Sequence, residues 1–387
     1  MDDHISAPHN GAEAALPPTA AAPAIPPAPT EPPLLRWPLA FHGQGSEYFR
    51  IWIVNLALSI VTLGIYSAWA KVRRLKYFYG NTELAGARFD YTADPLKILK
   101  GRAIAFVFFA AYVALSNIHP LTGIIAVLLL WLALPWMIVR SLAFNLRHTR
   151  YRNVSFGFAG TAGGGYKHFL LLPLLLIPSL GMALPYVQHQ QRQFLINNLR
   201  FGNQQFDMKP VIGPYFLIYL AAMGIASGVV MLLILMVVVI GLVAAAAGIA
   251  FDWGNSSDAL GVLAVLGIGG IFLAYAGMGM FYSIVMQTMH VALLNVTWSN
   301  TRVADCQIES KIGLPGYVKL LCTRIPLLVI TLGLATPWVV ITLMRYRLQH
   351  TAIHAPNDLG KFEAAIASYG NVTGSEAGEL FDLDLAL

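Results

Sequence analysis

The stretch "TLGIYSAWAKVRRLKYFYGNTELAGARFDY", Thr62–Tyr91, joins three patterns within thirty residues. It begins at the end of an apolar run and continues as "GIYSAWAKVRRLKYFY", where apolar residues recur at helical spacing. The basic residues of this helical part are Lys71, Arg73, Arg74 and Lys76. We therefore predict a helix that leaves the membrane and keeps a basic side in water, facing anionic lipid. The alternating tail Thr82–Tyr91, with a turn residue at Gly86, predicts a short β-hairpin.

The internal spacing of this stretch recurs along the chain. From Trp69, steps of twelve, thirteen, seventeen and twenty residues reach Asn81, Thr82, Gly86 and Phe89. Similar residues follow five anchors, at Trp69, Trp136, Tyr186, Thr288 and Trp338, with a weaker copy at the fourth and a truncated one at the fifth. The position seventeen residues on is Gly86, Asn153, Asn203 or Asp305. All four residues tolerate the left-handed conformation of a tight turn.

The recurrence predicts an internal repeat of membrane segment, basic helix and hairpin. Four hairpins can pair into a small sheet or barrel at the membrane face; irregular loops are the alternative.

Composition places the chain in a membrane. Of its 387 residues, 57% are hydrophobic and 11% charged, and the mean hydropathy is +0.63. Long apolar segments lie near 48–69, 103–118, 121–139, 168–187, 211–250, 259–287 and 317–343, and the fifth is long enough for two helices. We therefore predict an all-α polytopic membrane protein with seven or eight hydrophobic segments and repeated short juxtamembrane β-hairpins.

The two ends differ from the middle of the chain. Residues 1–35 form a Pro/Ala-rich tail with acids and no Lys or Arg, for which we predict disorder. Residues 355–387 form an acidic C-terminal tail, and 36–354 form the multi-pass membrane domain with the internal repeats. A net charge of +6 beside hydrophobic runs is typical of positive loops at an anionic leaflet rather than of nucleic-acid binding. The expected partners are thus anionic lipid head groups, while the sequence does not identify a protein partner.

The sidedness of three segments stays open. Residues 70–102 carry eight basic residues, which the positive-inside rule places in the cytoplasm. If segment 168–187 crosses once, the basic regions on either side of it lie on opposite faces. If it turns back at one of its prolines, they share one face, but segment 48–69 has no proline. Segments 48–69, 168–187 and 317–343 therefore either span or re-enter, and the charge pattern favours hairpins that share the cytoplasmic face.

Little in the sequence indicates chemistry. Beyond Arg50, Lys319 and Arg324 toward the starts of their segments, the apolar segments carry no Asp, Glu, Lys or Arg, and Asn55 is the most notable polar residue within them. It makes either an interhelical hydrogen bond or a substrate contact. No catalytic, cofactor or metal motif appears, so we expect no enzyme. A transporter or channel-like protein then requires a continuous polar path. A non-catalytic scaffold that binds anionic lipid or a protein predicts a tightly packed bundle with a basic cytoplasmic face.

Three stretches carry a family resemblance: "FHGQGSEYF", "IWIVN" and the thirty residues quoted first. With them the sequence resembles the YjgN family of bacterial inner-membrane proteins, which is defined as a domain of unknown function. The resemblance covers roughly Arg36 to His354. It implies a multi-pass protein of the bacterial inner membrane, and it implies no activity and no functional residues.

Overall fold

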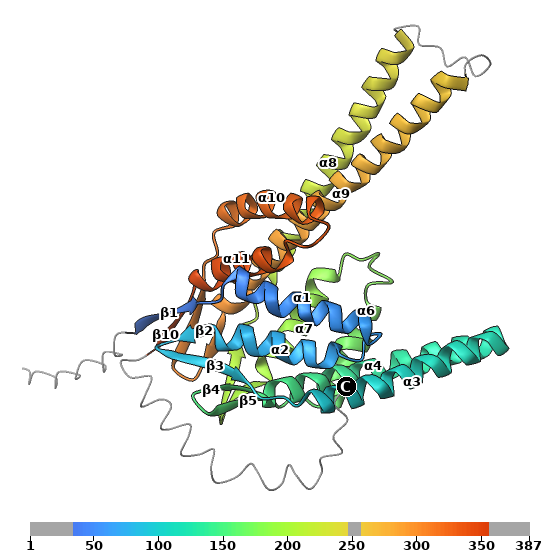
Figure 1. The fold of residues 1–387 in the computed structure, drawn as a ribbon. Coiled ribbons are helices and arrows are strands. Elements are labelled where there is room, and N and C mark those ends of the chain that lie inside the picture. Colours follow the sequence, from blue (N-terminus) through green and yellow to red (C-terminus); the bar gives the residue numbers. More distant parts are fainter. Residues whose placement is uncertain (1–33, 247–256, 356–387) are drawn as a thin grey trace, which may run out of the picture. The chain divides into compact units, whose positions relative to one another are not determined.

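The structure is a computed structural model that describes residues 34–246 and 257–355. Nearly all of the tail predictions, for 1–35 and 355–387, fall outside the described residues. The strands are β1 (Leu35–Phe41), β2 (Thr82–Leu84), β3 (Ala87–Tyr91), β4 (Thr149–Tyr151), β5 (Val154–Phe158), β6 (Leu199–Phe201), β7 (Gln204–Met208), β8 (Thr301–Val303), β9 (Cys306–Ser310) and β10 (Thr351–Ala355) (Figure 1). The helices are α1 (Gly45–Val61), α2 (Ser67–Gly80), α3 (Pro95–Ile118), α4 (Pro120–Arg147), α5 (Ala162–Tyr166), the π-helical η1 (Lys167–Leu171), α6 (Leu172–Leu174), α7 (Leu184–Asn197), α8 (Ile212–Ala246), α9 (Ser257–Ser299), α10 (Leu314–Ile330) and α11 (Thr336–Gln349).

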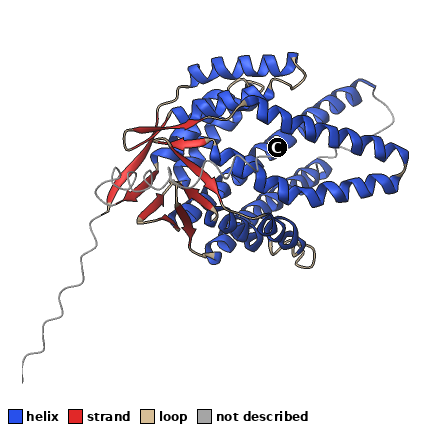
Figure 2. Cartoon of the chain, turned by 90° about the horizontal axis from the view of Figure 1, so that it is seen from below, coloured by secondary structure: helices blue, strands red, loops and turns tan. Residues whose placement is uncertain are grey.

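The described strands form one closed antiparallel barrel. Its order is β1-β10-β9-β8-β7-β6-β5-β4-β3-β2, so the first and last strands pair and close the ring. Figure 2 shows the strands gathered together, with the helices extending from them. Closure leaves no strand edge exposed, which lets strands of only three to seven residues persist. The turns of the four β-hairpins consequently lie at one rim of the barrel.

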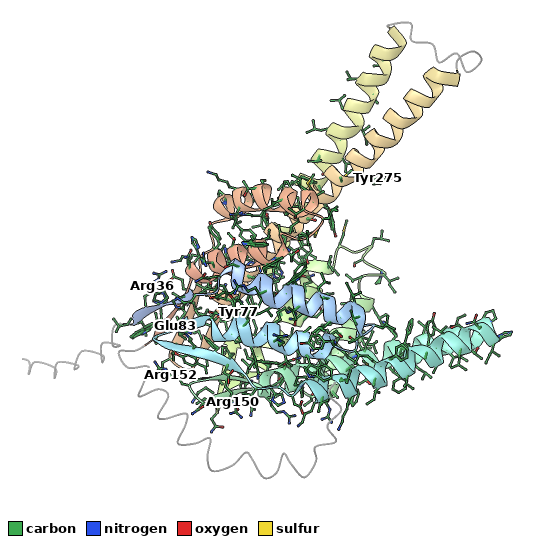
Figure 3. The ribbon with its side chains drawn as sticks, in the orientation of Figure 1. Arg36, Tyr77, Glu83, Arg150, Arg152 and Tyr275 are labelled. Atoms are coloured by element: carbon green, nitrogen blue, oxygen red, sulfur yellow. The ribbon has the colours of Figure 1, made fainter. Side chains whose placement is uncertain are left out.

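Side-chain alternation fixes which face of each strand enters the barrel. Phe89, Phe156 and Phe201 point into the lumen, where the rings of Phe156 and Phe201 lie 4.9 Å apart and those of Phe89 and Phe156 lie 6.4 Å apart. On the outer face, opposite charges face each other across strands: Glu83 and Arg88, Asp90 and Arg150, Asp207 and Arg302. Cross-strand pairs of opposite charge favour this register over a slip by one residue. Figure 3 labels Glu83 and Arg150 on these strands.

The all-α prediction is therefore wrong. The short alternating stretches such as "ARFDY" and "VSFGF" do form hairpins, β2–β3 and β4–β5. Together with β6–β7, β8–β9, β1 and β10 they build one closed barrel, which confirms the sheet-or-barrel alternative over irregular loops. Local alternation identifies a hairpin, whereas closure depends on pairing between residues such as Trp37 and Ile353 at opposite ends of the chain.

Five pairs of helices connect the described strands. They are α1 with α2, α3 with α4, the α5–η1–α6 arm with α7, α8 with α9, and α10 with α11. Each pair leads from the end of one strand to the start of an antiparallel neighbour, for example from β3 to β4. Because of this alternation, all five pairs leave the barrel from the same rim.

The prediction of seven or eight membrane segments is also wrong. By length and composition, the described residues contain four helices able to cross a bilayer: Pro95–Ile118, Pro120–Arg147, Ile212–Leu232 and Tyr275–Ser299. Segments 48–69, 168–187 and 317–343 instead break at Leu63-Gly64, Leu180-Gly181 and Leu332-Gly333, where both residues of each pair have positive φ. The two arms on either side of each break pack together. A count of apolar residues does not distinguish one long helix from two shorter antiparallel ones.

A recurring polar pair ends the second helix of the helix pairs. Asn81, Asn198 and Asn300 each donate a side-chain hydrogen bond to the carbonyl four residues earlier, and His350 contacts the corresponding carbonyl of Tyr346. The threonine that follows does the same after α2, α4, α9 and α11. These bonds satisfy carbonyls that a helix end leaves without partners, at the point where the chain enters a strand. The anchors Trp69, Trp136, Tyr186, Thr288 and Trp338 all lie in these second helices.

The hairpin turns follow the predicted spacing only in part. Gly86 and Asn153 have positive φ, as predicted. In the β6–β7 and β8–β9 turns, Gly202 and Ala304 are left-handed instead, so the predictions for Asn203 and Asp305 are wrong. All four hairpins nevertheless have a two-residue turn at the same place in the repeat. The first turn residue, Ala85, Arg152, Gly202 or Ala304, is left-handed in each.

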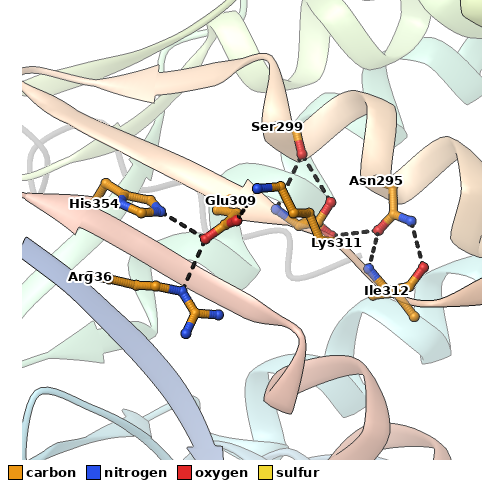
Figure 4. Close-up of polar contacts among 8 residues, drawn as sticks. Arg36, Asn295, Ser299, Glu309, Lys311, Ile312 and His354 are labelled. Atoms are coloured by element: carbon orange, nitrogen blue, oxygen red, sulfur yellow. Dashed lines mark hydrogen bonds and ion pairs between the residues drawn. The ribbon is translucent and has the colours of Figure 1, made fainter.

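An ionic cluster joins three neighbouring strands where the barrel closes. The Glu309 carboxylate on β9 accepts from Arg36 Nε of β1 at 3.1 Å and contacts His354 Nε2 of β10 at 2.7 Å (Figure 4). Lys311 Nζ lies 2.5 Å from its second oxygen. The hydrogen bonds from Lys311 and His354 lower the pKa of Glu309 to about 2. Residues from the first and the last strand in the sequence thus meet at one carboxylate.

We expect this carboxylate to make the barrel less stable in acid. The pKa of Glu309 is about 2 in the folded chain against 4.5 ordinarily, so its stabilisation is complete above the ordinary value and is lost as pH falls from there toward 2. The thermal unfolding temperature, measured in detergent, should therefore fall more steeply between about pH 5 and pH 2.5 for the parent than for Glu309→Gln. Asp305→Asn, in the neighbouring exposed turn, should keep the parent's slope. Equal slopes for parent and Glu309→Gln would contradict the assignment.

Candidate functional site

A chamber of about 1100 Å³ lies between the helices and the barrel. Its walls come from α1, α2, α3, α4, α9 and α11 and from six of the strands, β1 to β6. The apolar wall includes Trp52, Leu56, Leu75, Phe78, Val340 and Met344. Helices far apart in the sequence thus enclose one space, which is mainly apolar and open to its surroundings.

Three cations line this chamber. Lys71 and Arg74 lie one turn apart on α2, and Arg102 comes from the start of α3 and donates to the Ser67 hydroxyl. No Asp or Glu is among the described lining residues. Burial, followed by the charges of Arg102 and Arg74, lowers the pKa of the Lys71 ammonium. The cations therefore gather without a neutralising carboxylate, which makes the chamber attractive to an anion.

The structure separates the four basic residues predicted as one lipid-facing cluster. Lys71 and Arg74 face the chamber. Arg73 turns toward α1 and donates to Asn55 Oδ1 at 3.5 Å and to the Tyr66 hydroxyl at 2.9 Å. Lys76 is exposed and lies outside the chamber lining. Helical spacing explains the division, because residues three apart share a face and residues one or two apart do not.

Asn55 lies where both of its predicted contacts are available. Its side chain is buried, lines the chamber and accepts the Arg73 hydrogen bond from the facing helix. The interhelical alternative thus has a named partner, and the chamber position keeps a ligand contact within reach. Sequence reasoning missed Arg102 as a companion, although it is the last basic residue before the apolar run 103–118 and so sits at the membrane boundary.

The barrel lumen adjoins the chamber. It holds a smaller cavity of about 440 Å³, lined mainly by aromatic and aliphatic side chains of the strands. Both cavities are lined by Leu39, Phe89, Phe156, Leu199, Trp298, Met344 and Leu348. Among these described residues the shared boundary is wholly apolar, so the two spaces together suit a long apolar group better than a hydrated ion.

Comparison with known proteins identifies the family. The model of a family described as "Bacterial protein of unknown function (DUF898)" matches residues 36–380, most of the chain. The chain belongs to this family. Similar proteins include the inner membrane protein YjgN of Escherichia coli (strain K12), 34% identical over 142 residues, or 36% of each chain. YjgN of Salmonella typhimurium is 32% identical over 147 residues, 38% of this chain and 37% of the relative. These matches span little more than a third of the relatives' length. No solved structure matches the chain.

The family assignment agrees with the resemblance noted in the sequence. The similar proteins are inner membrane proteins, and the described residues hold four helices with the length and apolarity to cross a bilayer. The chain is thus a multi-pass inner-membrane protein of a family without an assigned activity.

Proposed function

We propose that this protein binds an anionic lipid of the inner membrane in the chamber. The phosphate lies among Lys71, Arg74 and Arg102, and the acyl chains lie along the apolar wall. The observation that carries the proposal is the grouping of three cations, with no described carboxylate among the lining residues, in the wall of an apolar space. Phosphate oxygens accept charge-assisted hydrogen bonds from several donors at once, and guanidinium groups match their geometry.

The dimensions favour an amphiphile. Small-molecule sites commonly enclose about 300 to 1,000 Å³, and this chamber has about 1100 Å³ with a further 440 Å³ in the adjoining lumen. A small inorganic anion would leave most of that apolar surface uncovered. A lipid with one charged group and long chains would cover both parts.

The two hypotheses from the sequence receive unequal support. A channel for polar solutes requires a polar path, but the described lining of the lumen is mainly apolar. The scaffold hypothesis included anionic lipid as a ligand, which the cations support, although its tightly packed bundle does not agree with so large a chamber. We retain lipid binding and place the barrel on the cytoplasmic side, where basic segments concentrate.

We also propose that the chamber was built from the internal repeat. Five helix pairs each carry one predicted anchor in the second helix, and four of the five second helices end in the same threonine contact. A duplicated unit would supply the walls of one central chamber from successive copies. This explains why its lining comes from so many separate segments.

The test is lipid binding by the full chain. Lys71→Gln with Arg74→Gln should weaken binding of phosphatidylglycerol, measured by native mass spectrometry in mild detergent, by about tenfold, since two charged contacts at about 0.7 kcal/mol each in an open site amount to about 1.4 kcal/mol. The matched control is Arg50→Gln with Lys76→Gln, which removes the same charge from two exposed residues outside the chamber lining. If both double variants lose equal affinity, binding reflects overall charge, and the proposed site is wrong.

A further inference from the structure

The three short helix pairs end in the same unusual turn. In "TLG", "SLG" and "TLG", Leu63, Leu180 and Leu332 have φ of 49°, 50° and 49°, and the glycine that follows each is also left-handed. Leucine in this conformation costs roughly 1–2 kcal/mol. These leucine side chains nevertheless lie outside the protein, with 94%, 91% and 93% of their surface exposed. The strain therefore presents a large apolar side chain to the surroundings three times.

The hydrogen bonds of these turns are internally satisfied. In each turn the glycine N–H donates to the carbonyl five residues earlier, at 2.7–2.8 Å. The hydroxyls of Thr62, Ser179 and Thr331 each donate to the carbonyl four residues earlier, at 2.7 Å. Each hydroxyl also accepts from the N–H four residues later, at 2.9–3.2 Å. A turn in water does not require that its backbone groups be hydrogen-bonded internally, because water can bind them. A turn in hydrocarbon does require it, because lipid supplies no hydrogen-bond partner for the backbone.

Exposed apolar residues surround each turn. Ile60, Val61 and Ile65 flank the first, Ile177 and Met182 the second, and Ile330 and Leu334 the third. Such a surface on three separate tips is larger than scattered single exposures explain. Partners for these tips have to be apolar.

The barrel topology directs these tips toward the membrane. The three short pairs leave the same rim as the α3/α4 and α8/α9 pairs, which contain the helices able to cross the bilayer. We infer that the three short helix pairs re-enter the membrane, with their Leu-Gly tips among the acyl chains of one leaflet. This inference does not depend on the lipid-binding chamber.

Helix length agrees with a single leaflet. The Lys or Arg nearest each tip in sequence is Lys71, Arg192 or Arg324. They lie eight to twelve residues from the tip leucines, which at 1.5 Å per residue is about 12 to 18 Å of helix. Half of the hydrocarbon core is about 15 Å thick. A tip at the bilayer midplane therefore leaves the charged groups near the lipid head groups.

The experiment places a fluorophore on a tip. Leu180→Cys in a Cys322→Ser background leaves Cys306, which is buried, as the remaining native cysteine. After labelling, the full chain is reconstituted in phosphatidylethanolamine and phosphatidylglycerol vesicles, and quenching by 12-doxyl lipid is compared with quenching by iodide. The ratio of lipid to iodide quenching should be about threefold or more above that of Ser155→Cys, an exposed residue on β5. Met182→Cys, outside the left-handed pair and also exposed, repeats the measurement if Leu180→Cys does not fold.

Two results would overturn the inference. Iodide quenching at Leu180 as strong as at Ser155 would place the tip in water. Protection of the label from both quenchers, together with a disulfide between two copies of the unlabelled Leu180→Cys variant when an oxidant such as diamide is added, would assign the tip to contact with a second copy of the chain. Preferential lipid quenching at Leu180 and at Leu332→Cys supports re-entry of both pairs.

Discussion

A chain that ends at His350 should fail to fold, whereas one that ends at Pro356 should fold. The first lacks β10, which pairs with both β1 and β9. Its loss leaves two unpaired strand edges and removes Ala352 and Ala355, which are fully buried. Since a domain is stable by about 5–15 kcal/mol, loss of a strand that closes the barrel should remove most of that stability.

The measurement is the yield of monodisperse protein extracted from membranes, with resistance to limited proteolysis as a second readout. Ala352→Asp in the full-length chain tests the pairing of β10 with its two neighbours without truncation, because it places an unpaired carboxylate at a fully buried position. We expect Ala352→Asp to be protease-sensitive and the chain ending at Pro356 to resemble the parent. Equal yields from the His350 and Pro356 truncations would show that the barrel does not depend on closure by β10.

The closure of the barrel by β1 and β10 also shows a first limit of prediction from the sequence. The hairpin at Thr82–Tyr91 is predictable, because alternation and a turn residue are local properties. The pairing of Leu35 with Ala355 depends on the spatial proximity of the two ends of the domain. Neither "LRWPLAF" nor "TAIHA" has a nearby turn or partner strand that would identify it as part of a sheet.

The membrane segments show a second limit. Apolar length alone predicts crossing, and the Leu-Gly pairs were visible in the sequence as a shared feature of three segments. The hydroxyl residue before each pair is the additional signal, since Thr62, Ser179 and Thr331 satisfy the backbone of the turn. Recognised together, a hydroxyl residue, leucine and glycine within an apolar run indicate a reversal rather than a continuous helix.

The chamber shows a third limit of prediction from the sequence. Helical spacing places Lys71 and Arg74 on one face of α2, which is predictable from a single helix. Arg102 joins them only because α2 and α3 pack together, and Trp298 and Met344 join from helices about two hundred residues away in sequence or more. A site assembled from several helix pairs is therefore divided among segments whose shared location the sequence does not record.

The second large effect is expected in the barrel lumen. Phe201→Ala should destabilise the protein by about 3–5 kcal/mol, because it removes a buried aromatic ring and leaves a cavity. Phe201 is buried and its ring centroid lies 4.9 Å from that of Phe156 and 6.2 Å from that of Tyr151. Thermal unfolding in detergent measures the loss, and Arg200→Ala on the outer face of the same strand, where it is exposed, should change stability by only about 0.5 kcal/mol.

Replacement by a polar residue distinguishes a packed core from a conduit. If the lumen is a dry apolar space, Phe201→Ser should cost at least as much as Phe201→Ala, because the serine hydroxyl lacks a partner among the surrounding aromatic and aliphatic side chains. In a water-filled path the hydroxyl would be hydrated, so Phe201→Ser would be the milder of the two substitutions. A milder serine variant would therefore favour passage of polar solutes through the barrel, whereas a more severe one supports a lumen that accommodates only apolar groups such as acyl chains.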